Sequence, residues 1–166
     1  MSSNNSKIHF ILLAAGNSTR FSKKNNKLLV KFKNNNILEY NLSKIKEQNF
    51  NKITIVVNNI KLPKTQLFER IEVVKGGKTR SLSVRNALIS SKYKAKYVMV
   101  HDAARPLYSN KLINKLSDKI ITGKYDCVIP YSNCSDTVLQ DNIDINRKKL
   151  NLIKTPQVFS KVKLIK

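Results

Sequence analysis

The sequence is poor in the residues that mark specialised classes of protein. Its 166 residues include two cysteines, four glycines, four prolines and no tryptophan. Two cysteines are too few for a disulfide-stapled scaffold, and so little glycine and proline excludes a collagen-like or low-complexity chain. The apolar runs are far shorter than the roughly 20 residues that cross a bilayer. We therefore expect one folded domain over residues 1–166 with no membrane partner.

The two cysteines, Cys127 and Cys134, are not spaced as zinc ligands or as a redox pair. We expect reduced thiols without a chemical role, with Cys127 as a small core residue and Cys134 as a loop residue. The polar segment Met1–Lys7 lacks both the basic and the apolar part of a signal peptide. This favours a cytoplasmic location.

Acidic residues are scarce relative to basic ones. Ten Asp and Glu residues stand against 32 Lys and Arg residues, and the formal net charge is +22. Such a chain attracts polyanions, but charge alone does not distinguish nucleic acid from a nucleoside triphosphate. No aromatic platform is interleaved with the basic residues, so nucleic acid is not the expected partner.

The apolar residues alternate between strand-like runs and helical spacing. This alternation predicts strand–helix–strand units with parallel strands, and hence an α/β sandwich with a mainly parallel sheet. Ligands of such sheets bind where the carboxyl ends of the strands converge. The predicted strands are 7–13, 52–57, 71–74, 97–100 and 127–130, and the predicted helices are 37–45, 81–90 and 111–121.

The segment Tyr131–Leu150 does not follow this alternation. It is polar and rich in Asn and Asp around a few isolated apolar residues. Two interpretations remain open: a flexible insertion, or a protruding arm that pairs with a second subunit.

A turn of small residues follows the first predicted strand. Its backbone amides can approach an anion closely, which is typical of a phosphate-binding loop. Arg20 and Lys27 add positive charge, the first as a planar fork and the second as a point charge. Neither G-x-G-x-x-G nor G-x-x-x-x-G-K-[ST] occurs in the chain, which disfavours a dehydrogenase or a P-loop protein.

Four motifs in a fixed order resemble those of the 2-C-methyl-D-erythritol 4-phosphate cytidylyltransferases, a family of sugar-phosphate nucleotidyltransferases. All four lie at predicted loops or at the starts of elements. Asp136-Thr137 falls between the third and the fourth motif, as it does in the family. The motifs are Ala14-Ala15-Gly16-x-Ser18-x-Arg20 with Lys27, Gly76-Gly77-Lys78-Thr79-Arg80-Ser81-Leu82-Ser83, Val100-His101-Asp102-Ala103-Ala104-Arg105-Pro106, and Thr155-Pro156-Gln157.

The resemblance implies a Rossmann-like three-layer α/β/α sandwich with an arm around residues 131–150. It implies transfer of a cytidylyl group from CTP to 2-C-methyl-D-erythritol 4-phosphate with release of pyrophosphate. Arg20, Lys27 and Asp102 are then the catalytic residues, and Asp102 also holds Mg²⁺. A helix N-cap is the alternative role for Asp102. His101 is expected to be a packed residue at a strand end rather than a base, because a phosphate monoester is already largely ionised near neutral pH.

The same resemblance assigns the binding residues. A homodimer is implied because Thr137 and Arg147 map onto residues that the family lends to a neighbouring subunit. Arg105 either grips the acceptor phosphate or supports the Asp102 loop. The nucleotide-binding residues implied are Ala14, Ala15, Gly16, Asn17, Ser18, Thr19, Gly77, Arg80, Ser83 and Ala103. Those implied for the acceptor are Asp102, Arg105, Thr137, Arg147 and Thr155.

The sequence departs from the family pattern at two places. Asn26 replaces the Pro that precedes Lys27 in the family, which loosens a turn. The sequence ends at Lys166, whereas the family continues through another strand and helix that carry an acidic metal-site residue and a catalytic lysine.

Several hypotheses therefore stay open. The chain is a piece of a longer enzyme, such as one fused to the cyclodiphosphate synthase of the same pathway, or an inactive domain that binds CTP or polyanions. Ribitol-5-phosphate cytidylyltransferase is the alternative activity.

Overall fold

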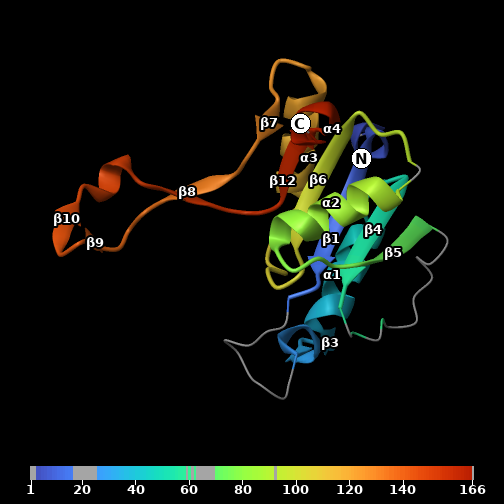
Figure 1. Cartoon of the computed structure of the whole chain (residues 1–166), viewed down its shortest axis with the longest axis horizontal. Helices are drawn as coiled ribbons and strands as arrows, with labels where there is room; N and C mark the ends of the chain where they lie inside the picture. The colour runs from blue at the N-terminus through green and yellow to red at the C-terminus, as the bar shows by residue number, and fades with distance from the viewer. Residues whose placement is uncertain are drawn as a thin grey trace.

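A six-stranded sheet in the order β5-β4-β1-β6-β12-β7 forms the body of the protein, with helices on both faces (Figure 1). The structure is a computed structural model that describes residues 3–16, 26–58, 60, 62, 70–91 and 93–165. The strands of this sheet are β1 (Ile8–Ala14), β4 (Lys52–Val57), β5 (Ile71–Lys75), β6 (Tyr97–Asp102), β7 (Cys127–Val128) and β12 (Gln157–Ser160). The α-helices are α1 (Ile37–Lys46), α2 (Arg80–Ser90), α3 (Asn110–Ile121) and α4 (Lys161–Ile165).

The central strand β1 separates two apolar layers. It pairs in parallel with β4 and β6, and β4 pairs in parallel with β5. Phe10 and Leu12 pack in one cluster with residues of α1 and α3, whereas Ile11 packs in a second cluster with residues of α2. Alternate side chains of a strand face opposite sides, so a strand buried on both faces reads as a continuous apolar run. The expected three-layer α/β/α sandwich is confirmed.

Side-chain caps set where the helices begin. Asn36 and Glu39 form a capping box at the start of α1, in which each side chain accepts a hydrogen bond from the other residue's backbone N–H. Thr79 caps α2 and Ser109 caps α3. In each case the hydroxyl of the cap accepts a hydrogen bond from a backbone N–H in the first turn of the helix. Such caps satisfy backbone donors that have no partner within the helix. Both α2 and α3 therefore begin one residue before the apolar pattern predicts.

Strand β12 is the main element that the sequence pattern did not predict. It lies between β6 and β7 and is antiparallel to both. Four residues give too short a pattern to distinguish a strand from a loop, although Val158 is fully buried. The sheet is therefore mixed, with its parallel part formed by β5, β4, β1 and β6. Strand β7 is also shorter than predicted. It ends at Val128, whereas the predicted strand ends at residue 130.

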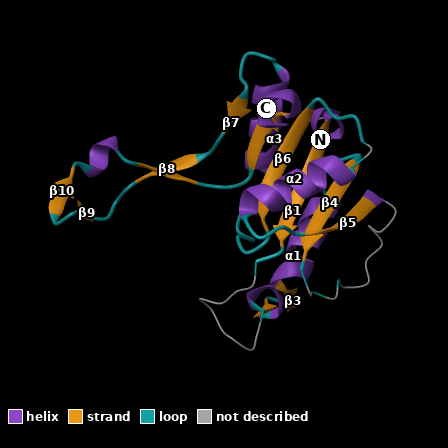
Figure 2. Ribbon diagram, in the orientation of Figure 1, coloured by secondary structure: helices purple, strands orange, loops and turns teal. Residues whose placement is uncertain are grey.

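The segment after β7 leaves the body as a two-part arm (Figure 2). Strands β8 (Tyr131–Asn133) and β11 (Asn151–Ile153) form its antiparallel stem. Strands β9 (Val138–Gln140) and β10 (Ile143–Ile145) form a hairpin at its tip. Asp141 and Asn142 have positive φ angles of 53° and 64° in the turn of this hairpin, as a type I′ turn requires. The expected protrusion is confirmed, and its stem extends to Ile153.

Short elements complete the described chain. A β-hairpin precedes α1, and single turns of 3-10 helix lie at the N-terminus, before that hairpin and in the arm. They are η1 (Ser3–Lys7), η2 (Lys27–Leu29), β2 (Lys31–Phe32), β3 (Asn35–Asn36) and η4 (Arg147–Lys149).

The structure contradicts the prediction for Cys127 and confirms the loop position of Cys134. Cys127 is exposed and Cys134 is buried, and both are free thiols. The prediction of Cys127 as a core residue was wrong because β7 is an edge strand of only two residues. Cys134 follows the first strand of the arm stem, where its backbone N–H donates to the carbonyl oxygen of Leu150. Among the described residues, no helix is long and apolar enough to span a membrane.

Candidate active site

A cleft of about 730 Å³ opens at the carboxyl ends of β1, β4, β5 and β6. It is lined by the turn after β1, the loop from β5 to α2 and the loop after β6. These three segments carry three of the four motifs found in the sequence. Parallel strands bring their carboxyl ends to one edge of the sheet, which explains why motifs so distant in sequence meet here.

Asn58 joins the turn after β1 to the loop after β5. Its Nδ2 atom donates to the carbonyl oxygen of Ala15 at 3.3 Å, and its Oδ1 atom accepts from the backbone N–H of Gly76 at 3.1 Å. A Cβ atom on Gly76 would collide with the Cβ atom of Ala15 and crowd the Asn58 amide. Only glycine therefore permits this approach of the two loops. Sequence reasoning missed Asn58, because a single Asn at a strand end carries no motif.

Gly77 and Ser83 form the wall of the cleft beside α2. The backbone N–H of Gly77 donates to Oγ of Ser83 at 3.1 Å, and Ser83 is buried. A Cβ atom on Gly77 would collide with Leu82 in the first turn of α2. The N-terminus of α2 therefore lies at the cleft, where its partial positive charge favours an anion.

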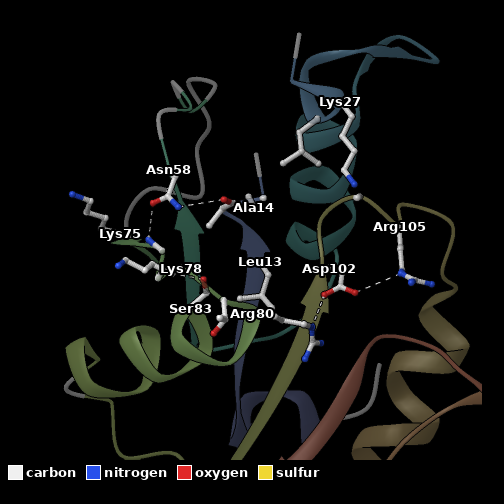
Figure 3. Close-up of a pocket in the computed structure, with 17 residues that line it drawn as sticks. Leu13, Ala14, Lys27, Asn58, Lys75, Lys78, Arg80, Ser83, Asp102 and Arg105 are labelled. Atoms are coloured by element: carbon white, nitrogen blue, oxygen red, sulfur yellow. Dashed lines mark hydrogen bonds and ion pairs between the residues drawn. The ribbon is translucent and has the colours of Figure 1, made fainter. Parts of the chain in front are cut away.

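Asp102 stands between two arginines at the end of β6 (Figure 3). Nε of Arg80 lies 3.1 Å from Oδ1 of Asp102, and Nε of Arg105 lies 3.5 Å from Oδ2. Of the two roles considered for Arg105, the structure thus shows support of Asp102. The N-cap interpretation of Asp102 is wrong, because Ser109 caps the following helix α3.

His101, the neighbour of Asp102, points into the protein rather than into the cleft. Its side chain is fully buried, and burial lowers the pKa of His101 to about 4 against the smaller raising effect of Asp102. The imidazole is therefore neutral at physiological pH. Nε2 lies 3.0 Å from the carbonyl oxygen of Arg105, and Nδ1 lies 3.0 Å from Oγ1 of Thr155. The expectation of a packed residue at a strand end is confirmed.

Basic side chains surround the cleft on both sides. Lys27 lies on the side of Asp102 and Arg105, whereas Lys75 and Lys78 lie on the opposite side (Figure 3). Among the described residues that line the cleft, the only carboxylate is that of Asp102. The local charge is strongly positive, which favours a polyphosphate. The sequence assigned a role to Lys27 but none to Lys75, an isolated lysine, or to Lys78, which lies within the second motif.

Lys27 begins the short helix η2, which Asn26 caps. The Asn26 side chain accepts a hydrogen bond from the backbone N–H of Leu28 at 3.0 Å. Leu28 is buried in the core, so η2 is anchored to the body. The expectation of a loosened turn before Lys27 was wrong, because the Asn26 side chain holds the turn by a hydrogen bond.

Ala14, Ala15 and Gly16 line the cleft as predicted, but Ala103 does not. Ala103 is fully buried, and its backbone N–H donates to the carbonyl oxygen of Leu13 at 3.0 Å. It therefore fixes the spacing between the ends of β1 and β6. Predictions for four further residues of the first motif fall outside the described residues: Asn17, Ser18, Thr19 and Arg20.

Three predicted acceptor residues lie away from the lining of the cleft. Thr155 sits behind it, against His101, where the arm returns to the body. Thr137 and Arg147 are exposed on the arm, and Nη1 of Arg147 donates to the carbonyl oxygen of Ser135 at 2.8 Å. The arm projects away from the sheet (Figure 1), so within one subunit the structure does not bring these two residues to the cleft.

Among the described residues that line the cleft, the carboxylate available to a metal ion is that of Asp102. Within the described part of the chain, no cluster of three or more His, Cys, Asp or Glu side chains is arranged to hold a metal ion. Mg²⁺ is commonly bound by one or two carboxylates together with substrate phosphates and waters. Asp102 fits that mode when a bound phosphate chain and waters supply the remaining oxygen ligands, because one carboxylate cannot complete the coordination of Mg²⁺.

An α/β/α sandwich with a strongly basic cleft at the carboxyl ends of its parallel strands is the architecture of a nucleotide-binding domain. The chain belongs to the 2-C-methyl-D-erythritol 4-phosphate cytidylyltransferase family, IspD, whose family model matches residues 8–166.

Relatives of known sequence are longer than this chain. The bifunctional enzyme IspD/IspF of Pelagibacter ubique (strain HTCC1062) is 41% identical over 163 residues, which cover 93% of this chain and 43% of the relative. The bifunctional enzyme IspD/IspF of Campylobacter jejuni (strain 81-176) is 39% identical over 164 residues, which cover 97% of this chain and 42% of the relative. The chain thus spans less than half the length of these curated relatives.

Solved structures are similar over the same region. The bifunctional IspDF from Campylobacter jejuni matches with a TM-score of 0.80 and 34% identity, over 93% of this chain and 41% of that one. The 2-C-methyl-D-erythritol 4-phosphate cytidylyltransferase (IspD) of Francisella tularensis matches with a TM-score of 0.75 and 29% identity, over 93% of this chain and 72% of that one.

Proposed function

We propose that this cleft transfers a cytidylyl group from CTP to 2-C-methyl-D-erythritol 4-phosphate and releases pyrophosphate. The observation that carries the proposal is the meeting of the small residues after β1, several basic side chains and one carboxylate at a single edge of the sheet. Membership of the cytidylyltransferase family, with matched residues 8–166, supports the choice of nucleotide and acceptor.

The reaction needs charge stabilisation more than proton transfer. A phosphate oxygen of the acceptor attacks the α-phosphorus of CTP, and a new P–O bond forms. The bond from the α-phosphorus to its bridging oxygen breaks, and pyrophosphate leaves with the electron pair. Fixed cations that neutralise charge on the transferred group are the usual source of catalysis in such a displacement. We assign this role to Lys27 and, from the motif, to Arg20.

The nucleotide fits the part of the cleft between the turn after β1 and α2. We propose that the triphosphate lies against the amides of Ala14–Gly16, and that the cytosine lies near Gly77 and Ser83. Lys75 and Lys78 add positive charge on that side.

Mg²⁺ is the proposed cofactor, with Asp102 as its protein ligand. When bound, the ion would neutralise phosphate charge and polarise the α-phosphate. Arg80 and Arg105 each pair with one oxygen of Asp102, and the second lone pair of either oxygen can coordinate the metal. A guanidinium beside the metal would also be well placed to bind a phosphate.

We propose a homodimer in which the arm serves a neighbouring subunit. Support comes from the exposure of its apolar side chains, since Leu139 is 60% and Ile143 is 71% exposed at the tip of the arm. In this arrangement Thr137 and Arg147 contact the acceptor bound to the partner, whereas Asp102, Arg105 and Thr155 contact it from the same subunit.

The bifunctional relatives suggest an association with the second enzyme of their name, IspF. We propose that the present domain acts beside a cyclodiphosphate synthase, either in one chain or as a separate partner. The proposed compartment is the cytoplasm, in keeping with two unpaired thiols at Cys127 and Cys134.

The test is an assay of pyrophosphate release with CTP, Mg²⁺ and 2-C-methyl-D-erythritol 4-phosphate. We expect release that depends on all three. Ribitol 5-phosphate is assayed in parallel. A higher kcat/KM with ribitol 5-phosphate would show that it is the preferred acceptor. Binding of CTP by a folded sample without any release would instead indicate a nucleotide-binding domain without turnover.

A further inference from the structure

A buried asparagine ties helix α1 to the loop that begins at Asp102. Asn41 is fully buried in the middle of α1, and its Nδ2 atom donates to the carbonyl oxygens of Ala103 at 2.8 Å and Ile37 at 2.9 Å. A carbonyl oxygen only accepts hydrogen bonds, so these partners fix which end of the amide is the nitrogen. The backbone N–H of Ala103 donates to the carbonyl oxygen of Leu13. Both backbone polar groups of Ala103 are therefore held, one by the end of β1 and the other by α1.

Asn41 occupies this position against its local preference. The other buried residues of α1 are Leu38, Leu42 and Ile45. Asparagine is a poor helix former, because its side chain competes with the backbone for hydrogen bonds. Among the described residues, the buried Oδ1 atom of Asn41 has no hydrogen-bond partner, which costs free energy that an apolar side chain would not. The hydrogen bond that leaves the helix, to Ala103, is therefore what asparagine adds at this position.

A second side chain of α1 holds the far end of the same loop. Lys44 follows Asn41 by three residues, so the two side chains lie on one face of the helix. Its Nζ atom donates to the carbonyl oxygen of Tyr108 and, at 3.5 Å, to that of Pro106. The ammonium group also lies 4.2 Å from the centroid of the Tyr108 ring. The loop 102–108 is thus attached to α1 near both of its ends.

Helix α1 supports Lys27 as well. Leu28, its neighbour in η2, is buried in the core cluster that includes residues of α1. The backbone N–H of Ile37, the first residue of α1, donates to the carbonyl oxygen of Val30 at 3.2 Å. Lys27 and Asp102 therefore line the cleft from two segments that rest on the same helix (Figure 3).

We propose that Asn41 is a positioning residue through which α1 sets the place of Asp102 relative to Lys27. Its hydrogen bond to Ala103 fixes the backbone directly after Asp102, and hence the direction in which the carboxylate enters the cleft. A displacement of about 1 Å that originates away from the reacting atoms can lower the rate of an enzyme about 100-fold. The inference rests on the proposed function, because it assumes that Asp102 and Lys27 act on the substrates.

The chain contains a matched control in a second buried asparagine. Asn5 is 2% exposed, and its Nδ2 atom donates to Oε1 of Gln48 at 3.0 Å and to Oδ1 of Asn114 at 3.1 Å. Its own Oδ1 atom, like that of Asn41, has no partner among the described residues. Asn5 lies in η1, before the amino end of β1, and thus at the opposite edge of the sheet from the cleft. Alanine at either position removes two hydrogen bonds, but only Asn41 reaches the loop of Asp102.

The kinetic test compares Asn41→Ala with Asn5→Ala in the full chain. We expect Asn41→Ala to lower kcat about tenfold or more, because the Asp102 loop loses a fixed contact. KM for CTP should change less than about twofold, because Gly77 and Ser83 are held by a separate hydrogen bond. Asn5→Ala should keep both parameters, although the two variants should lower Tm by similar amounts. Equal kcat values in the two variants would overturn the proposal.

A second measurement is independent of activity. In backbone amide NMR spectra without ligands, we expect the resonances of residues 102–105 to move in Asn41→Ala and to stay in place in Asn5→Ala. Resonances that stay in place in both variants would overturn the inference even if the chain transfers cytidylyl groups. If the chain shows no transfer but the resonances move as expected, the proposed function fails while the positioning contact stands.

The unaltered chain decides the matter if Asn41→Ala does not fold. Both protons on Nδ2 of Asn41 donate to buried carbonyl oxygens, so they should exchange slowly with solvent. Exchange as fast as that of an exposed asparagine side chain would show that the contact with Ala103 is not maintained, and would overturn the proposal.

Discussion

Arg80 and Asp102 form a hydrogen-bonded ion pair, with Nε of the arginine 3.1 Å from Oδ1 of the carboxylate. The pair joins the first residue of α2 to the last residue of β6, across the mouth of the cleft. The two side chains are 48% and 26% exposed. Ion pairs so accessible to water contribute little to stability, typically about 0–1 kcal/mol. The pair therefore matters for the charge and shape of the cleft more than for folding.

Asp102→Asn should separate function from stability. The change removes the carboxylate that we assign to Mg²⁺ but keeps the shape of the side chain. We expect kcat to fall about 100-fold or more, in the range seen when one preorganised electrostatic contact is lost. The free energy of unfolding should change by less than about 1 kcal/mol. Asp126→Asn, which breaks the exposed pair with Lys163 far from the cleft, is the control and should retain activity. Full activity of Asp102→Asn would remove the proposed metal ligand.

Lys27→Ala should depress turnover much more than stability. Lys27 lies at the cleft in a helix that the Asn26 cap and buried Leu28 hold in place, so its ammonium group is presented by a fixed element. We expect kcat to fall by about 100-fold, with an unfolding midpoint close to that of the parent. Lys31→Ala, an exposed lysine of β2, is the matched control. Arg20→Ala is expected to behave as Lys27→Ala does. Unchanged rates in both cleft variants would contradict the assigned roles.

Gly76→Ala should weaken both the fold and CTP binding. The new methyl group would collide with Ala15 and crowd the Asn58 amide, so the two loops must move apart. Overpacking of this kind costs about 1–3 kcal/mol. Gly123→Ala is a useful comparison, because Gly123 has φ of 74° with no described atom near its added methyl group. Its cost of about 1–2 kcal/mol is purely backbone strain. Calorimetric titration with CTP should show reduced affinity for Gly76→Ala alone.

Acidification should destabilise the protein through its buried histidines. Burial lowers the pKa of His9 and of His101 to about 4, from 6.5 in an exposed histidine. Because the unfolded chain takes up protons first, this contribution is fully present above about pH 6.5 and is lost as the pH falls toward 4. Each histidine accounts for about 3 kcal/mol over that interval. Urea unfolding at several pH values should show the decline, and His9→Leu should show a shallower one. An identical slope in that variant would contradict this origin.

Charges on the tip of the arm should prevent self-association. Leu139 and Ile143 are exposed apolar residues on paired strands β9 and β10, so lysine at both positions should not disturb the body of the protein. We expect sedimentation to show a dimer for the parent and a monomer for the double variant. Leu107→Lys, at a residue 79% exposed outside the arm, is the control and should remain dimeric. A monomeric parent would count against the proposed dimer.

Much of the candidate site was already predictable from local patterns. A buried strand such as β1 needs a continuous run of apolar residues, and the turn after it needs small residues. Both features depend on neighbouring positions in the sequence and can therefore be recognised without the fold. The order of strands and helices follows from the same periodicities. These periodicities predicted the layers and the edge of the sheet that binds ligands, whereas the resemblance of the motifs to a family implied the residues Gly16, Lys27, Gly77, Ser83, Asp102 and Arg105.

Relationships between residues far apart in sequence emerge only when the chain has packed. Asn58 gains its role because β4 brings it between Ala15 and Gly76, and His101 because β12 places Thr155 against its ring. Neither relationship has a local pattern, since each depends on which strands become neighbours. Cys127 was misplaced for the same reason, because a strand's apolar sequence does not reveal whether it lies at the centre or the edge of a sheet. Periodicity is a property of the chain, whereas adjacency is a property of the packed sheet.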